Sequence, residues 1–251
     1  MSHLPARVRE CVSYHDGMPV TPPPTDSGPD RVLLASQSPR RRRLIALLGI
    51  TPQVTAVDTP ENLDTPLARD PRALAEALAA EKVLEARAQG LGPDSLVLTF
   101  DTIVVHEGGV LGKPMDVEDA WRMLRSLAGK MHQVVTGVAM LCPGADAPEV
   151  FSVATNVRMR DLSDRDIEGW MSSGEFMGCA GAYNIEGQVA EVDAAECFQN
   201  VAGAPLCHLY AHLRALSCAS DLRVGVRSPI VACDNLLGRR CQLGRELLGE
   251  A

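Results

Sequence analysis

Residues 32–49 read VLLASQSPRRRRLIALLG, and this stretch decides the fold that the sequence predicts. Its first part, VLLAS (residues 32–36), is a short apolar run that ends in a polar turn, a pattern typical of a buried strand. Pro39 stands where the first turn of a helix tolerates proline, and Gly49 follows the helix expected over residues 40–48, where helices commonly end. The stretch therefore predicts a strand, a serine-rich turn and a helix in direct succession.

Further strands and helices alternate along the chain. The apolar and polar patterns predict strands over residues 53–57, 96–105, 132–142 and 150–162, a hairpin turn over 106–110, and helices over 71–90, 117–129, 162–174, 205–216 and 235–248. Ser163 and Asp166 are spaced as in a capping box. Such a mixture of elements indicates an α/β (mixed α+β) fold with a mixed sheet and flanking helices.

One domain accounts for most of the 251 residues. Residues 1–30 end in a proline-rich segment and are interpreted as a flexible leader, because proline fixes φ and removes a backbone donor. Residues 31–216 hold all the predicted strands and form the expected domain. Residues 217–251 show little strand-like pattern and form a C-terminal tail whose role the sequence leaves open.

The chain is acidic overall, with 24 lysines and arginines against 32 aspartates and glutamates and a formal charge of −8. This charge repels nucleic acid and anionic lipid in general, so a phosphorylated partner must be met locally. No apolar run approaches the roughly 18 residues that a membrane span needs, and the N-terminal residues lack the apolar core of a signal peptide. We therefore expect no nucleic-acid partner, no membrane partner and a cytoplasmic location.

Eight cysteines are scattered along the chain without a C-x-x-C pair. In a chain of this length without a secretory signal, such spacing favours reduced thiols over a disulfide framework or a zinc site. We therefore expect free thiols throughout, in agreement with a cytoplasmic location.

A run of four arginines follows the serine-rich turn. The free backbone N–H groups of a turn that leads into a helix attract an anion, with the positive end of the helix dipole behind them. Ser36, Ser38, Arg40 and Arg41 add hydroxyl and guanidinium donors that match phosphate oxygens. Two other interpretations stay open: a solvated helix face with ordinary serine caps, and nucleic-acid binding, which the net charge disfavours. The last two arginines of the run are interpreted as solvent-facing.

Asp101 interrupts an otherwise apolar strand, where an ionised carboxylate is costly unless it is hydrogen-bonded, paired or metal-bound. Glu61, in the loop after the second strand, is a second acidic candidate, and Lys82 and Lys113 are candidate phosphate ligands. Taken singly, Glu61 is better explained as a solvated loop acid and Lys82 as a solvent-facing side chain, and Lys113, between Gly112 and Pro114, is not convincing alone. Together with the arginines they indicate a site for a phosphorylated substrate and a divalent metal such as Mg²⁺.

Several segments resemble, in order and over about residues 31–216, the Maf family of nucleoside triphosphate pyrophosphatases: LLASQSPRRRRLIALLGI, LAAEKVLEA, DTIVVHEGGVLGKPMD, LSDRDIEGWMSSGE, CAGAYNIEG and NVAGAPL. The resemblance implies an elongated mixed α/β fold like that of the inosine triphosphate pyrophosphatases, with a cleft between two lobes. It also implies hydrolysis of the α–β phosphoanhydride bond of a nucleoside triphosphate, giving a monophosphate and diphosphate with Mg²⁺ or Mn²⁺. Such an activity would clean up modified or surplus nucleotides.

The resemblance assigns roles by position. Asp101 matches the family's catalytic acid, usually the proton acceptor, and Glu61 matches a loop glutamate implicated in metal or water handling, so both are expected metal ligands. The phosphate-binding positions are matched by Ser36, Arg40, Arg41, Lys82 and Lys113. The positions that distinguish substrates are matched by Arg40, Thr102 and Glu186.

The substrate signature is mixed. Arg40 with Thr102 resembles the branch that acts on dTTP and UTP, whereas Glu186 resembles the branch that acts on 7-methyl-GTP. An ionised glutamate accepts hydrogen bonds but cannot donate them, so Glu186 favours a base rich in donors or a cationic base. Two departures from the family pattern, Phe100 before the catalytic acid and Cys179 at a usual lysine position, are interpreted as packing residues.

Two rival functions stay open. A catalytically weak nucleotide-binding regulator of septum formation would share the binding segments, although the presence of both carboxylates and both lysines argues against it. An RNA-binding protein built on the arginine run would show salt-sensitive RNA affinity and no turnover. The resemblance is compatible with a homodimer, for which the sequence shows no interface stripe.

Overall fold

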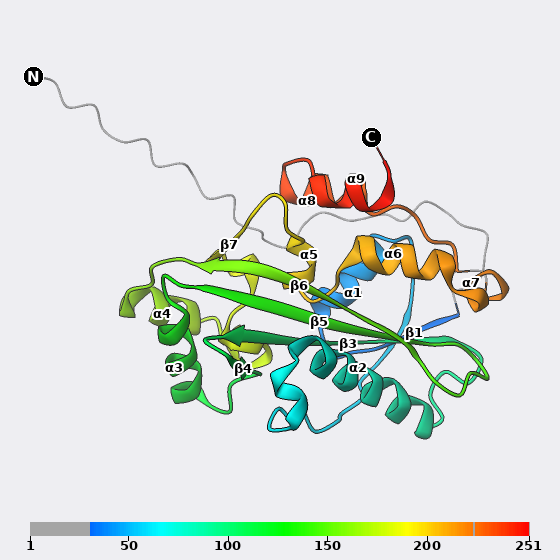
Figure 1. Cartoon of the computed structure of the whole chain (residues 1–251), viewed down its shortest axis with the longest axis horizontal. Helices are drawn as coiled ribbons and strands as arrows, with labels where there is room; N and C mark the ends of the chain where they lie inside the picture. The colour runs from blue at the N-terminus through cyan, green and yellow to red at the C-terminus, as the bar shows by residue number, and fades with distance from the viewer. Residues whose placement is uncertain (1–30, 223, 251) are drawn as a thin grey trace, which may run out of the picture.

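The structure is a computed structural model that describes residues 31–222 and 224–250, so the expected leader over residues 1–30 lies outside the described residues. The strands of the described chain are β1 (Val32–Ala35), β2 (Gln53–Thr55), β3 (Leu96–His106), β4 (Gly109–Leu111), β5 (Met131–Leu141), β6 (Glu149–Met159) and β7 (Ala190–Val192). These strands form one sheet in the order β2-β1-β3-β5-β6-β7, with β4 paired to β3 (Figure 1). β1 pairs parallel with β2 and β3, and the other pairs are antiparallel, which confirms the predicted mixed sheet.

Helices flank this sheet, as predicted. In the described residues the α-helices are α1 (Pro39–Ala46), α2 (Pro71–Ala88), α3 (Val117–Leu127), α4 (Asp164–Met171), α5 (Phe198–Val201), α6 (Leu206–Ala215), α7 (Ser217–Asp221), α8 (Ile230–Leu237) and α9 (Gln242–Leu248), and the 3-10 helices are η1 (Pro66–Arg69), η2 (Glu175–Gly178), η3 (Ala180–Ala182) and η4 (Ile185–Gly187). α2 packs on one face of the sheet, and α1, α5 and α6 lie on the other (Figure 1). None of the helices in the described residues combines the length and apolar character needed to cross a bilayer.

Local sequence explains where several helices begin and end. Ser38 caps α1, because its side chain accepts a hydrogen bond from the N–H of Arg41 at 3.4 Å. The predicted capping box of Ser163 and Asp166 is present at α4. The single helix expected over residues 235–248 is wrong: Gly238 takes a left-handed φ of 61°, which ends α8 before α9 begins.

α2 lies very close to the sheet at Gly137 of β5. A Cβ on Gly137 would lie 2.0 Å from the carbonyl oxygen of Ala75 in α2, so a larger residue would push the helix away. Gly137 also pairs across the sheet with Asp101 of β3. The glycine thus brings α2, with Lys82, onto the strand that carries Asp101.

A disulfide joins Cys142, just beyond β5, to Cys218 in α7. The prediction of reduced thiols is therefore wrong for this pair, because folding brings together two cysteines that lie 76 residues apart in the sequence. The other five cysteines of the described residues are free. Disulfides are rare in cytosolic proteins, so the cytoplasmic expectation loses the support that reduced thiols gave it. The bond ties the C-terminal segment to the sheet, and Ala219 and Leu222 of that segment join the main core.

Candidate active site

A cleft opens along one edge of β3. β1 pairs with residues 96–98 of that edge and β4 with residues 104–106, so the middle of β3 has no strand partner there among the described residues. The cleft at this gap has a volume of about 810 Å³. Because successive side chains of a strand point to opposite faces, Asp101 and Thr102 reach the cleft from the two faces of the sheet.

The predicted site residues all line this one cleft. They come from the end of β1, from α1, the loop after β2, α2, β3, the loop after β4 and η4, and comprise Ser36, Arg40, Arg41, Glu61, Lys82, Asp101, Thr102, Lys113 and Glu186. Segments far apart in the sequence therefore meet where the notched edge of the sheet leaves room for a ligand. The cleft has two chemically different ends.

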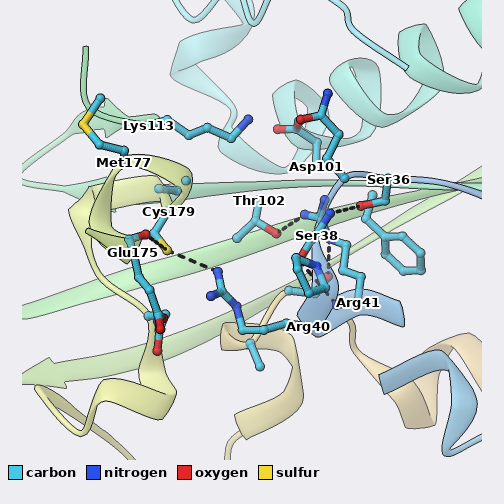
Figure 2. Close-up of a pocket in the computed structure, with 18 of the residues that line it drawn as sticks. Ser36, Ser38, Arg40, Arg41, Asp101, Thr102, Lys113, Glu175, Met177 and Cys179 are labelled. Carbon is cyan, nitrogen blue, oxygen red and sulfur yellow. Dashed lines mark hydrogen bonds between the residues drawn. The ribbon is translucent and has the colours of Figure 1, made fainter. Parts of the chain in front are cut away.

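Glu61, Lys82, Asp101 and Lys113 form the acid–lysine end. Asp101 is 2% exposed, and the Nζ atom of Lys82 contacts its Oδ1. The same Nζ lies 3.2 Å from Oε1 of Glu61, and Lys113 contacts that oxygen as well. Oδ2 of Asp101 is buried and has no hydrogen-bond partner in the described residues. Figure 2 shows Lys113 extended toward the region of Asp101.

The two lysines control the charge of Glu61. Partial burial alone raises the pKa of this carboxyl, but the charges of Lys82 and Lys113 and their hydrogen bonds outweigh burial, so the net shift lowers the pKa. Glu61 is therefore a carboxylate at neutral pH, and it holds both ammonium groups at the cleft wall.

Arg40, Arg41, Arg43, Cys179 and Glu186 form the arginine end. Arg41 is fixed on two sides, since its Nε donates to the carbonyl oxygen of Gly203 and its Nη2 donates to Oγ1 of Thr102, both at 2.9 Å. Its guanidinium lies over the ring of Phe100, with 5.6 Å between the group's carbon and the ring centroid. Burial lowers the pKa of Arg41 from its ordinary value. Phe100 belongs to the core, as expected, and its ring also packs against the guanidinium of Arg41.

Arg40, the neighbour of Arg41 in α1, contacts a thiol. Its Nη2 donates to Sγ of Cys179 at 3.2 Å, the bond drawn in Figure 2. Burial raises the pKa of the Cys179 thiol, despite the nearby Arg40, so the thiol is a poor nucleophile. The serine-rich turn lies next to these arginines: the hydroxyl oxygen of Ser36 accepts from the N–H of Ser38 at 3.2 Å and keeps its own hydrogen free to donate to a ligand.

Arg43 has a partner that the sequence analysis did not predict. It is exposed, as predicted, but its Nη2 lies 2.9 Å from Oε2 and 3.1 Å from Oε1 of Glu186. The two residues lie 143 positions apart, and both line the cleft. The side chain of Glu186 is 43% exposed, so the pair sits at the cleft mouth rather than in the core.

Tyr183 lines the cleft and had no predicted role, although it lies in the quoted segment CAGAYNIEG, which is the signal that could have pointed to it. It is 5% exposed, and its hydroxyl lies 2.6 Å from Nε2 of His132 on β5. Burial lowers the pKa of His132 to about 4, so the imidazole is neutral at pH 7. This neutral histidine supports the cleft wall from beneath.

Comparison with known proteins gives a consistent result. The family model described as Maf-like protein matches residues 31–216. A dTTP/UTP pyrophosphatase of Pelotomaculum thermopropionicum is 39% identical over 180 residues, which cover 71% of this chain and 92% of that protein. A dTTP/UTP pyrophosphatase of Anaeromyxobacter dehalogenans is 43% identical over 192 residues, covering 73% and 93%.

One solved structure, titled nucleoside-triphosphatase or dITP/XTP pyrophosphatase from Mycobacterium abscessus, shares 14% identity and a TM-score of 0.32 over 52% of this chain and 74% of that one, too little to support an inference. The family match and the relatives suffice. On both grounds, this chain belongs to the Maf family.

Proposed function

We propose that the protein is a nucleoside triphosphate pyrophosphatase, which uses water to split the α–β phosphoanhydride bond and releases a nucleoside monophosphate and diphosphate. The observation that carries the proposal is Asp101, a carboxylate 2% exposed at the cleft whose Oδ2 is buried without a partner in the described residues. Such a group is costly to keep and marks a functional site. The pyrophosphatase names of the relatives agree with this reaction.

Asp101 is the proposed proton acceptor. Lys82 holds the carboxylate through Oδ1, which leaves Oδ2 to take a proton from the attacking water. Glu61 in turn fixes Lys82 and Lys113, so that both ammonium groups stand beside the reacting phosphate.

The cations of the cleft are the proposed phosphate ligands. Phosphoryl transfer needs charge neutralisation and a positioned water more than covalent help, and Lys113, Arg40 and Arg41 supply positive charge along the cleft. The hydroxyl hydrogen of Ser36 adds a neutral donor at the start of α1. These groups stabilise the negative charge that develops on the departing diphosphate.

A divalent cation, Mg²⁺ or Mn²⁺, fits the residues present. In the described residues no group of three or more His, Cys, Asp or Glu side chains is placed to hold a metal alone, but these ions need only one or two carboxylates together with substrate phosphates. Asp101 and Glu61 would hold it, and Oδ2 of Asp101 has lone pairs for both a metal and a proton. When bound, the ion supplies positive charge that polarises the phosphate.

We further propose dTTP and UTP as the preferred substrates. The relatives carry that name, and Arg40, which resembles the residue of the dTTP and UTP branch at this position, lies in the cleft. Glu186 favours a cationic base such as that of 7-methyl-GTP, but its exposed ion pair with Arg43 offsets part of that preference. The ion pair therefore weakens the argument for 7-methyl-GTP and supports the choice of dTTP and UTP.

The test incubates the purified protein with Mg²⁺ and a panel that includes dTTP, UTP, 7-methyl-GTP, dCTP and ATP, and measures diphosphate against orthophosphate. Diphosphate release, fastest with dTTP and UTP, is expected. Nucleotide binding without turnover would instead favour the regulatory protein, and orthophosphate release would contradict the proposed bond.

Asp101→Asn is the first variant to measure. We expect diphosphate release to fall by about 100-fold or more, because the amide cannot accept the water's proton, while nucleotide affinity is kept. Asp221→Asn changes an exposed aspartate of α7 and serves as the control. Near wild-type release by Asp101→Asn would show the assignment to be wrong.

The proposal retains two further expectations, a homodimer and a cytoplasmic location. Light scattering of the purified chain distinguishes a monomer of 26.9 kDa from a particle of twice that mass. Fractionation of the cells that make the protein tests its location.

A further inference from the structure

The guanidinium of Arg41 belongs to a closed ring of hydrogen bonds. Nη2 of Arg41 bonds Oγ1 of Thr102 at 2.9 Å, and Oγ1 of Thr102 bonds Oγ1 of Thr136 on β5 at 3.0 Å. Thr136 donates to the carbonyl oxygen of Asn200 at 3.0 Å, which also accepts the N–H of Gly203 at 2.9 Å. The carbonyl of Gly203 accepts Nε of Arg41 at 2.9 Å and closes the ring.

Proton counting fixes the direction of every bond in this ring. The backbone carbonyl of Asn200 can only accept a hydrogen bond, so Thr136 must donate its single hydroxyl hydrogen to it. Thr102 must therefore donate its own hydrogen to Thr136. That leaves the lone pairs of Thr102 for Arg41, a group that only donates. The orientation of the Thr102 hydroxyl toward the cleft thus depends on Thr136.

The ring is built on strand register and burial. Thr102 and Thr136 are directly paired residues of β3 and β5, so their side chains stand on the same face of the sheet. Thr136 and Asn200 are both 0% exposed, so neither makes direct contact with a ligand in the cleft. Through Thr102 and Gly203 they reach Arg41, whose Nη2 and Nε are thereby taken, which leaves its Nη1 group for phosphate. The side-chain amide of Asn200 also donates to the carbonyl oxygen of Val134, a residue that lines the cleft, at 3.2 Å.

We propose that Thr136 is a positioning residue, which orients Thr102 so that Arg41 presents its guanidinium to the triphosphate. The inference rests on the proposed function. It changes the role of Thr102, which acts on the nucleotide through Arg41 and the phosphates rather than by contact with the base.

The test compares Thr136→Val, which removes the hydroxyl at similar shape, with Thr136→Ser, which keeps it. The backbone carbonyl of Asn200 keeps the N–H of Gly203 as a donor in both variants, so neither substitution leaves that carbonyl unpaired. For Thr136→Val we expect the KM for dTTP to rise about 10-fold with kcat changed less than about threefold, and Thr136→Ser to stay within about twofold of wild type. UTP and 7-methyl-GTP should lose by the same factor as dTTP, since they share the triphosphate.

Thr155→Val is the matched control. Thr155 is also 0% exposed and also bonds Asn200, whose Nδ2 donates to its Oγ1 at 3.0 Å, but it lies outside the ring. We expect it to lower the melting temperature as much as Thr136→Val does and to leave KM unchanged. In a double-mutant cycle, Thr102→Val combined with Thr136→Val should be no worse than Thr102→Val alone, because both act through Arg41.

Titration of inorganic tripolyphosphate by calorimetry gives a readout without turnover. Its Kd should rise about 10-fold in Thr136→Val and stay unchanged in Thr155→Val. Equal effects of the two variants, a loss confined to one nucleotide, or no tripolyphosphate binding by the wild type would each overturn the inference. A wild-type protein that binds tripolyphosphate but releases no diphosphate would refute the proposed function alone.

Discussion

The two ends of the cleft differ in whether their cationic side chains are in direct contact with carboxylates. At the acid–lysine end, Lys82 and Lys113 are paired with the carboxylates of Asp101 and Glu61. At the arginine end, Arg41 bonds a hydroxyl and a carbonyl and Arg40 bonds a thiol, so only the exposed Arg43 is in direct contact with a carboxylate, although Arg41 also feels the charges of Asp101 and Glu61. Lysines in direct contact with carboxylates are held in place and suit a fixed catalytic site. Guanidinium groups without a carboxylate in direct contact can instead bind an anionic ligand. We infer that the first end sets the rate for every nucleotide and the second end sets affinity and choice.

The largest expected effect comes from removing the balance at the acid–lysine end. Lys82→Met leaves Asp101 without its contact and Glu61 with one lysine, so kcat should fall by about 100-fold or more for every nucleotide alike. The chain has three lysines in all, and Lys130→Met is the control, because Lys130 pairs with exposed Glu107. A loss for some nucleotides only, measured as kcat over the panel, would erase the distinction between the two ends.

Acid should affect the buried histidine behind Tyr183 and the acid–lysine end at different pH. The folded-state pKa of His132 is lowered to about 4 from 6.5, so the unfolded chain takes up a proton first and stability is lost as pH falls from 6.5 toward 4. Between pH 7 and pH 4.5, protonation of His132 in the unfolded chain should lower the free energy of unfolding by about 2–3 kcal/mol. The pKa of Glu61 is lowered as well, so the acid–lysine end loses its pairing only below the ordinary carboxyl range.

Urea unfolding of wild type and His132→Gln at pH 7, 5.5 and 4.5 measures this difference. The variant should show the shallower pH dependence, because glutamine does not titrate. Parallel curves would mean that the buried histidine beneath Tyr183 contributes nothing to the acid response.

The smallest expected effect is on nucleotide choice. Glu186→Gln removes the charge that pairs with Arg43 and adds a donor, so the ratio of kcat/KM for dTTP to that for 7-methyl-GTP should rise about 10-fold. Glu168→Gln, on the exposed face of α4, is the control. If the ratio of the kcat/KM values is the same in Glu186→Gln as in the wild type, Glu186 does not select the base. If kcat/KM falls by the same factor for every nucleotide, Glu186 acts in phosphate binding instead.

Local pattern explains most of what the sequence could predict. The strand before Ser36, the cap at Ser38 and the capping box at Ser163 depend on neighbours a few residues away, and all are present. Asp101 was found because a carboxylate in an apolar strand is anomalous by itself. The missed features depend on distant partners: Arg43 with Glu186, Cys142 with Cys218, and the carbonyl of Gly203 with Arg41. No periodicity or spacing encodes these contacts, since their partners lie far apart in the sequence and meet only in the folded chain.

Gly137 has a consequence for how the cleft moves. Where the backbone of α2 rests directly on the backbone of β5, there is no layer of side chains that could slide or repack, so this wall is stiff. We therefore expect the cleft to open by movement of the opposite wall, residues 174–187. This wall is a succession of short 3-10 helices, with left-handed φ values at Gly174, Gly181 and Ala182. Added nucleotide should therefore slow amide hydrogen exchange across that segment and leave exchange in α2 as it was.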